Sequence, residues 1–154
     1  MQLASINLRA DKEIVKLAVL DDASALEFAS DELRADKEMV KIAVSRKPHA
    51  LEYASIDLRA DKEIVMIAVS LNFSALRFAS EELQADKEFV KNIVSRKGMA
   101  LEYASIDLRA DREIVLIAVS QAIYYNLDPL QFASKELQTD KEIIEIAASH
   151  YVRH

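Results

Sequence analysis

The sequence repeats an acidic triplet whose carboxylates could bind cations. Asp-Lys-Glu occurs five times and Asp-Arg-Glu once, and these triplets begin at Asp11, Asp36, Asp61, Asp86, Asp111 and Asp140. Carboxylate oxygens are the ligands that hard cations prefer, so a column of them could form a cation ladder. The same acids stand where a helix start would offer free N–H groups and the positive end of its dipole. We favour this second interpretation and expect the aspartates to cap helices.

An Ala-Ser pair precedes each triplet and supplies a second candidate group, the serine hydroxyl. The six serines are Ser5, Ser30, Ser55, Ser80, Ser105 and Ser134. A catalytic serine needs a base such as histidine beside it. The chain has only three histidines, and none of them recurs with the repeat. We therefore expect the serines to cap helices or to bond nearby backbone.

The remaining reactive residues are few. His150 and His154 have the i, i+4 spacing that can place two imidazoles on one helical face, but no third metal ligand follows and chain ends fray. The absence of cysteine excludes thiolate chemistry and disulfides, and the single glycine, Gly98, excludes glycine-rich phosphate loops. We expect a protein that is not an enzyme and that has no metal and no cofactor.

Charge narrows the choice of partner. The 154 residues include 26 acidic and 20 basic side chains, which gives a net charge of −6. A negative chain repels phosphate backbones and anionic lipid. The sequence opens without a secretory signal pattern, and no apolar run reaches the length of about 18 residues that a membrane span needs. We expect a cytoplasmic protein that binds neither nucleic acid nor membrane.

The elements that position these residues follow the same repeat. The triplets are 25 residues apart four times and 29 residues apart once, which defines six units. We place the units at residues 1–20, 21–45, 46–70, 71–95, 96–120 and 121–154, in one domain that spans residues 1–154. Phenylalanine precedes Ala-Ser in units two, four and six, whereas tyrosine precedes it in units three and five. The true period is therefore two units, about 50 residues.

Each unit reads as two short helices. Chain breakers recur at one phase, namely Ser24, Pro48, Ser74, Gly98 and the pair Asp128-Pro129. We expect a first helix of two turns to begin there, with Ser24 or Asp128 as its cap and Pro129 in its first turn. A second helix begins at the triplet, where Thr139 and Glu142 have capping-box spacing.

The second helix carries a broad apolar face. In the first unit Ile14, Val15, Leu17, Ala18 and Val19 cover an arc of about 200° at 100° per residue. Such an arc needs neighbours on two sides, because one unit cannot bury it alone. We therefore predict an all-α solenoid, a superhelical stack of six helix-turn-helix units.

Arginine precedes most of the triplets, and we expect it to pair with neighbouring carboxylates. The four arginines are Arg9, Arg34, Arg59 and Arg109. Gln84 and Gln138 interrupt the column, so the sequence does not predict a continuous track for anions.

Residues 50–65 read Ala-Leu-Glu-Tyr-Ala-Ser-Ile-Asp-Leu-Arg-Ala-Asp-Lys-Glu-Ile-Val and recur almost unchanged at 100–115. This pattern resembles the helical repeat family named domain of unknown function 4116, and the resemblance covers essentially the whole chain. It implies a repeat found in protists, large viruses and secreted effectors of intracellular bacteria, with the host cytosol as the location of such an effector. The family has no assigned activity, so no functional residue transfers. Where the family often has asparagine before the triplet, this chain has Ala10, Ala35, Ala60, Ala85 and Ala110, so we expect those helix starts to rely on aspartate instead.

Two places where the copies differ are candidate binding surfaces. Ile56, Met66, Ile106 and Leu116 are apolar at positions that are mostly charged in the other units. They could form a stripe for a partner helix or a second copy, or they could be core of differently packed odd units; both interpretations stay open. The insertion in the last unit contains Tyr124 and Tyr125, which could anchor an interface or cover the last layer.

We predict a non-enzymatic scaffold that binds another protein. The alternative is a structural or oligomerisation module, or an accessory domain of a larger secreted effector or viral protein. The first unit begins inside its first helix, so we expect apolar surface at the N-terminal end. That end would then self-associate or be covered by more of a longer chain.

Overall fold

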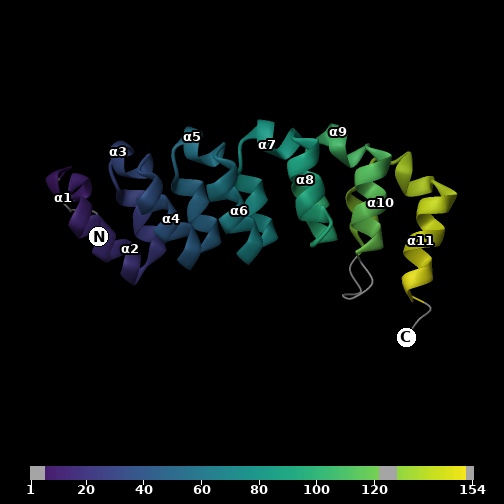
Figure 1. The fold of residues 1–154 in the computed structure, drawn as a ribbon, viewed down its shortest axis with the longest axis horizontal. Coiled ribbons are helices and arrows are strands. Elements are labelled where there is room, and N and C mark those ends of the chain that lie inside the picture. Colours follow the sequence, from purple (N-terminus) through teal and green to yellow (C-terminus); the bar gives the residue numbers. More distant parts are fainter. Residues whose placement is uncertain (1–5, 122–127, 152–154) are drawn as a thin grey trace. The chain divides into compact units, whose positions relative to one another are not determined.

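The computed structural model describes residues 6–121 and 128–151 of the chain. Every regular element within these ranges is a helix, and they contain no strand (Figure 1). Short helices follow one another in tandem, as the all-α repeat prediction requires. The contacts divide the chain into two compact units, residues 1–80 and residues 81–154. The word unit has this meaning from here on, and the six segments of about 25 residues in the sequence are called repeats.

The first unit alternates α-helices with 3-10 helices, which carry the label η. Its elements are α1 (Ile6–Ala10), α2 (Lys12–Asp21), η1 (Ala23–Phe28), α3 (Asp31–Arg34), α4 (Lys37–Arg46), η2 (Pro48–Tyr53), α5 (Ile56–Arg59), α6 (Lys62–Leu71) and η3 (Phe73–Phe78).

The second unit repeats this order. Its described elements are α7 (Glu81–Ala85), α8 (Lys87–Val94), η4 (Gly98–Tyr103), α9 (Ile106–Arg109), α10 (Arg112–Ser120), η6 (Pro129–Phe132), η7 (Leu137–Thr139) and α11 (Lys141–Tyr151).

The prediction of two helices per repeat is wrong, because the predicted first helix is divided in two by the Ala-Ser pair. In the third repeat η2 ends at Tyr53, and Ser55 then has extended backbone angles, φ −58° and ψ 158°. The Ser55 hydroxyl accepts a hydrogen bond from the Leu58 N–H at 3.4 Å and so starts the short helix α5. A repeat therefore contains a 3-10 helix, a short α-helix and a longer α-helix.

Two predicted helix caps are also wrong, because an acid one or two residues away from each does the capping. Ser24 lies inside η1, and the carboxylate of Asp22 accepts a hydrogen bond from its N–H at 2.9 Å. Thr139 donates its hydroxyl to the Glu136 carbonyl at 2.9 Å, while Asp140 caps α11. The prediction for Asp128 and Pro129 is confirmed, since Asp128 caps η6 and proline occupies its first turn.

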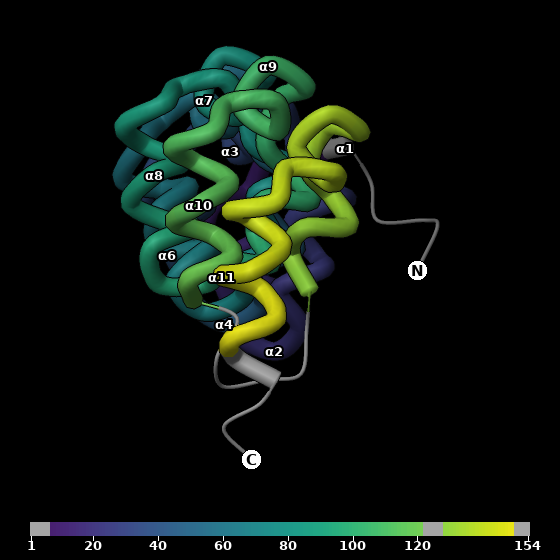
Figure 2. The backbone as a smooth tube through the Cα atoms, turned by 90° about the vertical axis from the view of Figure 1, so that its right-hand side faces the viewer, coloured from purple at the N-terminus to yellow at the C-terminus, as the bar shows by residue number. Residues whose placement is uncertain are grey.

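The longer α-helices of successive repeats lie side by side within each unit. Figure 1 shows α2, α4 and α6 in this arrangement in the first unit, and α8, α10 and α11 in the second. The 3-10 helices form a second row, in which η1 contacts η2 and η2 contacts η3 in the first unit, and η4 contacts η6 in the second. In the view of Figure 2 the segment at Pro129–Phe132 is seen to the right of α11. Leucines of the 3-10 row and valines of the α row fill the space between the rows; Leu26, Leu51, Val40 and Val115 are all 0% exposed.

A backbone hydrogen bond joins each repeat to the one before it. The N–H of the capping serine donates to the carbonyl that precedes the previous triplet by two residues, at 2.8 to 2.9 Å. The pairs are Ser30 to Arg9, Ser55 to Arg34, Ser80 to Arg59, Ser105 to Gln84 and Ser134 to Arg109. Because the acceptor is a main-chain oxygen, the change from arginine to Gln84 leaves this bond in place.

Gly98 begins η4 at a point where the backbone of α10 passes close by. A Cβ atom added at Gly98 would lie 2.2 Å from the Ala118 carbonyl oxygen and 3.2 Å from Cγ of Pro129. No side chain fits at the first of these distances, since a carbonyl of a helix cannot move aside easily. Gly98 therefore serves close packing between η4 and α10.

Candidate functional site

The repeated aspartates cap helices, as the sequence predicts. In Asp61, Oδ1 accepts hydrogen bonds from the backbone N–H groups of Glu63 at 2.9 Å and Ile64 at 3.1 Å. These groups have no partner inside the helix, so the carboxylate satisfies them and opposes the positive end of the dipole. The same capping is present at the aspartates of the other described triplets, namely Asp11, Asp36, Asp86, Asp111 and Asp140.

In Asp36, Asp61, Asp111 and Asp140 the second carboxylate oxygen pairs with a cationic side chain from the preceding repeat. Lys37 donates to Asp61 at 2.7 Å and to Glu63 at 3.0 Å. Lys87 makes the same pair of contacts with Asp111 and Glu113, at 2.7 and 3.0 Å. Lys12 pairs likewise with Asp36, and Arg112 pairs with Asp140 and Glu142. We call these contacts the ion-pair ladder.

The ion-pair ladder shifts the pKa of its members. The hydrogen bond from Lys37 is the largest influence on Asp61 and lowers the pKa of that carboxyl group. The bonds to Asp61 and Glu63 raise the pKa of Lys37. The carboxylates are thus held in their charged form by lysine.

Within residues 6–121 and 128–151 no three His, Cys, Asp or Glu side chains gather as a metal-binding group.

The serines of the Ala-Ser pairs have the predicted local role. The Oγ atoms of Ser30, Ser55, Ser105 and Ser134 each accept a hydrogen bond from the N–H of the leucine three residues later, at 3.3 to 3.4 Å. This is the geometry of a helix N-cap. The hydroxyls therefore hold backbone groups at the starts of short helices.

The prediction that the arginines pair with carboxylates is only partly correct. Arg34 forms an ion pair with Asp31, but Arg9 and Arg59 donate their Nε–H groups to the carbonyls of Phe28 and Phe78 at 2.6 Å. These carbonyls lie at the ends of η1 and η3, where a helix leaves its last acceptors without internal partners. The guanidinium group satisfies them from the preceding repeat.

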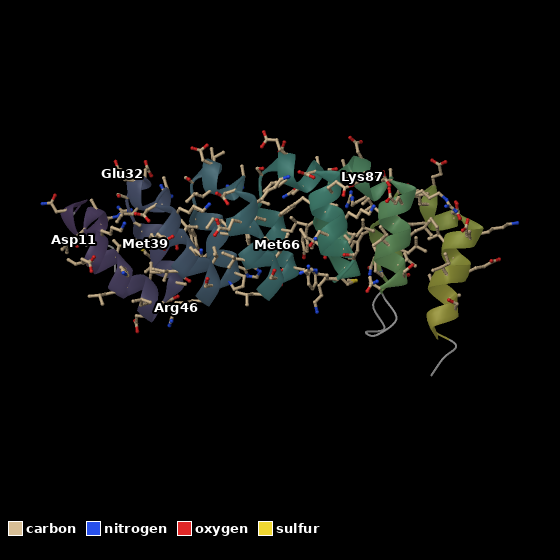
Figure 3. The ribbon with its side chains drawn as sticks, in the orientation of Figure 1. Asp11, Glu32, Met39, Arg46, Met66 and Lys87 are labelled. Carbon is tan, nitrogen blue, oxygen red and sulfur yellow. The ribbon has the colours of Figure 1, made fainter. Side chains whose placement is uncertain are left out.

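The candidate binding residues are in different environments. Ile56 is 78% exposed and Ile106 is 75% exposed, because each is the first residue of a short helix and points away from the core. Met66 and Leu116 are half-buried in α6 and α10. Figure 3 shows Met66 midway along α6. Tyr124 and Tyr125 lie outside the described residues.

The N-terminal end of the first unit exposes apolar side chains, as the sequence predicts. The prediction named no residues. The exposed residues are Leu8, Ile14, Leu17, Leu20 and Phe28, with exposures between 40% and 68%. Asp11, labelled in Figure 3, lies among them at the start of α2. The register could have identified Leu8 and Ile14, because every residue at their positions in later repeats is buried.

A shallow polar hollow lies where α2 and α4 end, in the first unit. Its volume is ≈ 500 Å³, and Asp21, Asp22, Ala23, Ser45, Arg46 and Lys47 line it. Figure 3 shows Arg46 at this end of α4. Since two acidic and two basic side chains share the hollow, it has no preference for a ligand of either charge.

Crossing a membrane demands a helix that is both long and apolar, and none of the described helices meets both conditions.

Sequence comparison agrees with the fold. The sequence pattern of a family described as domain of unknown function (DUF4116) matches residues 1–34, 36–84 and 86–127. No curated protein and no solved structure matches the sequence. The matched ranges cover nearly all of the first five repeats and the start of the sixth, including the triplets from Asp11 to Asp111 and the serines from Ser5 to Ser105. The chain therefore belongs to the family of domain of unknown function DUF4116.

Proposed function

We propose that this chain is a non-enzymatic scaffold that binds another protein through isoleucines exposed on its short helices. The exposure of Ile56 and Ile106 carries the proposal. Both residues stand where the alternate repeats have the charged residues Asp31, Glu81 and Lys135. An exposed isoleucine that contributes little to the core, at the same position in two repeats, offers an apolar contact to a partner.

The free energy gained by burying one isoleucine is large enough to matter for recognition. Burying one isoleucine side chain is worth about 1.5–3 kcal/mol, which corresponds to roughly tenfold or more in affinity. Acidic residues lie beside each isoleucine, with exposed Glu52 and Asp57 near Ile56. The partner that fits the surroundings of each isoleucine is a protein with a small apolar pocket and a basic rim. The net charge of −6 favours such a protein over nucleic acid.

The non-enzymatic part of the proposal is supported by how the repeated polar groups are used. The serines and aspartates that could act as nucleophiles or acids are engaged in helix caps and in the ion-pair ladder. A group with this structural task at every repeat is poorly suited to chemistry on a substrate. We place the scaffold in the cytoplasm.

The test replaces each isoleucine by the charge that the alternate repeats carry. Ile56→Glu and Ile106→Glu are made singly and together, and partners recovered by reciprocal pull-down from a relevant lysate are purified and titrated. We expect each single substitution to weaken binding at its own isoleucine by about tenfold, since one buried contact is lost there, and the double variant to leave neither contact. Leu71→Glu is the matched control, because Leu71 is 59% exposed at the end of α6 and away from the short helices.

The proposal fails if no partner is recovered, or if binding survives both substitutions in variants whose helical circular dichroism equals that of the wild type. Equal loss of binding in the Leu71→Glu control would also contradict it, because a general effect of added charge would then explain the result.

A further inference from the structure

We infer that the N-terminal repeat of one copy of this chain stacks against the C-terminal repeat of a second copy, and that it does so by the same contact that joins neighbouring repeats within each unit. The inference is independent of the proposed scaffold function, because it uses residues at the two end repeats and none of the exposed isoleucines on α5 and α9.

The first repeat exposes the face that repeats inside each unit turn toward their predecessor. Ile14 is 43% exposed, whereas Ile64 and Ile114 at the same position are 0% exposed. Leu8 is 42% exposed, and its counterpart Leu58 is 8% exposed. Since the repeats have nearly the same sequence, the difference in exposure comes from the neighbouring repeat that contacts Ile64 and Ile114 on this side, α4 against α6 and α8 against α10. This position therefore marks the surface that a preceding repeat covers.

The last repeat exposes the opposite face, the one that earlier repeats turn toward their successor. Ile144 is 42% exposed, whereas Val40 and Val115 at the same position are 0% exposed. Ala148 is also exposed, where the earlier Val119 is buried. The chain thus carries one surface that a preceding repeat fits and one that a following repeat fits.

Charge matches in the same register. Within each unit a lysine one residue after the triplet's aspartate binds the aspartate and the glutamate of the next triplet, as Lys37 does with Asp61 and Glu63. Lys141 is the equivalent lysine in the last repeat and is exposed. Asp11 and Glu13 are the equivalent acids in the first repeat and are exposed as well. Stacking of two copies brings Lys141 of one to Asp11 and Glu13 of the other.

One residue opposes this contact and sets its strength. Lys41 and Lys91 lie four residues after the ladder lysines and bind the glutamate of the next triplet. The last repeat has Glu145 at that position, which in a stacked pair faces Glu13. Like charges at an interface weaken it. The association is therefore modest, and Glu145→Lys is the substitution that strengthens it.

The two surfaces differ, so the contact is head to tail. A stack of two copies still has a free N-terminal surface at one end and a free C-terminal surface at the other. The assembly therefore grows with concentration unless it closes into a ring. The other occupants that could cover these surfaces are a foreign helix and additional repeats of a longer chain. A 154-residue chain that stays monomeric would point to one of them.

The test measures molar mass by sedimentation equilibrium from about 1 μM to about 1 mM, the range of dissociation constants that modest specific association covers. We expect a mass that rises above the 17.3 kDa of one chain as concentration increases. Leu17→Glu, at a residue that is 68% exposed, blocks the N-terminal surface. Lys141→Glu blocks the C-terminal surface and leaves α11 intact, because an acid is favourable in its first turn.

We expect each of these variants to associate at least about tenfold more weakly than the wild type, and Glu145→Lys to associate about tenfold more tightly. Ile56→Glu is the control and should associate like the wild type. An equimolar mixture of Leu17→Glu and Lys141→Glu has one working surface on each kind of chain, so it should stop at the mass of a dimer.

A wild-type mass that stays at 17.3 kDa up to about 1 mM overturns the inference, since an affinity weaker than that is not specific association. Association that neither Leu17→Glu nor Lys141→Glu reduces overturns it too. Growth of the mixture beyond a dimer would show that the copies meet through some other surface.

Discussion

Lys37 of one repeat donates a hydrogen bond of 2.7 Å to Oδ2 of Asp61 in the next repeat, while Oδ1 of the same carboxylate caps helix α6. One aspartate therefore both starts its own helix and binds that helix to its predecessor. The two tasks use different oxygen atoms, so substitutions can separate them.

Asp61→Ala removes both tasks, whereas Asp61→Asn keeps a side-chain oxygen for the cap and removes the ion pair. We expect Asp61→Ala to lower the free energy of unfolding by about 1–2 kcal/mol and Asp61→Asn by less than about 1 kcal/mol, because asparagine caps as well as aspartate and exposed ion pairs contribute little. Urea denaturation measures both values. Asp57→Ala, at an exposed aspartate of α5, is the control. Equal losses in the two Asp61 variants would contradict the separation of tasks.

Ile64 and Ile14 occupy the same position in two repeats with different surroundings. Ile64 is 0% exposed and Ile14 is 43% exposed. Truncating a fully buried isoleucine to alanine costs about 2–5 kcal/mol, and we expect Ile14→Ala to cost about half as much or less in the monomer. Thermal denaturation at low protein concentration compares the two variants. Similar losses would mean that the Ile14 side chain is covered in solution.

Gly98→Ala places a Cβ atom 2.2 Å from the Ala118 carbonyl oxygen, so η4 and α10 must move apart. We expect a loss of about 1–3 kcal/mol in the free energy of unfolding, the usual cost of overpacking. Pro48→Ala is the matched control, since Pro48 holds the same register in η2 and its side chain is already accommodated. A Gly98→Ala variant as stable as the control would refute the close contact.

Acid should weaken the ion-pair ladder. The hydrogen bond from the preceding lysine lowers the pKa of Asp36, Asp61 and Asp111 in the folded chain. A lowered folded pKa gives stability that is present above the unfolded value of about 3.9 and is lost as pH falls through the folded value. Urea midpoints should therefore drop below about pH 4, and Asp61→Asn should make that drop smaller. An unchanged midpoint at pH 3 would exclude this contribution.

The helix starts at the triplets could be predicted from sequence because the acid and the helix N-terminus attract each other locally. Asp61 needs only the N–H groups two and three residues ahead to act as a cap. The division of the predicted first helix could not be predicted in the same way. It depends on Ser55 adopting extended angles so that its N–H reaches the Arg34 carbonyl in the preceding repeat, which is a contact between repeats.

The candidate surface was only partly predictable for a related reason. Met66 and Ile56 are both apolar at positions that are mostly charged in the other repeats, so the sequence pattern does not distinguish the exposure of one from that of the other. Met66 lies midway along a long helix, where neighbours half cover it, whereas Ile56 lies at the tip of a short one and is 78% exposed. The length of the short helix decides the difference, and that length follows from the extended serine.

The ladder pairs Lys37 with Asp61 and Lys87 with Asp111 each span 24 residues. Each of these two bonds therefore joins one repeat to the next repeat along the chain. A gene duplication or deletion of a whole 50-residue double repeat would recreate each of these bonds with equivalent residues on either side. Chains of this type can thus change length during evolution without passing through an unstable intermediate, and the surface that a partner meets can lengthen or shorten with them.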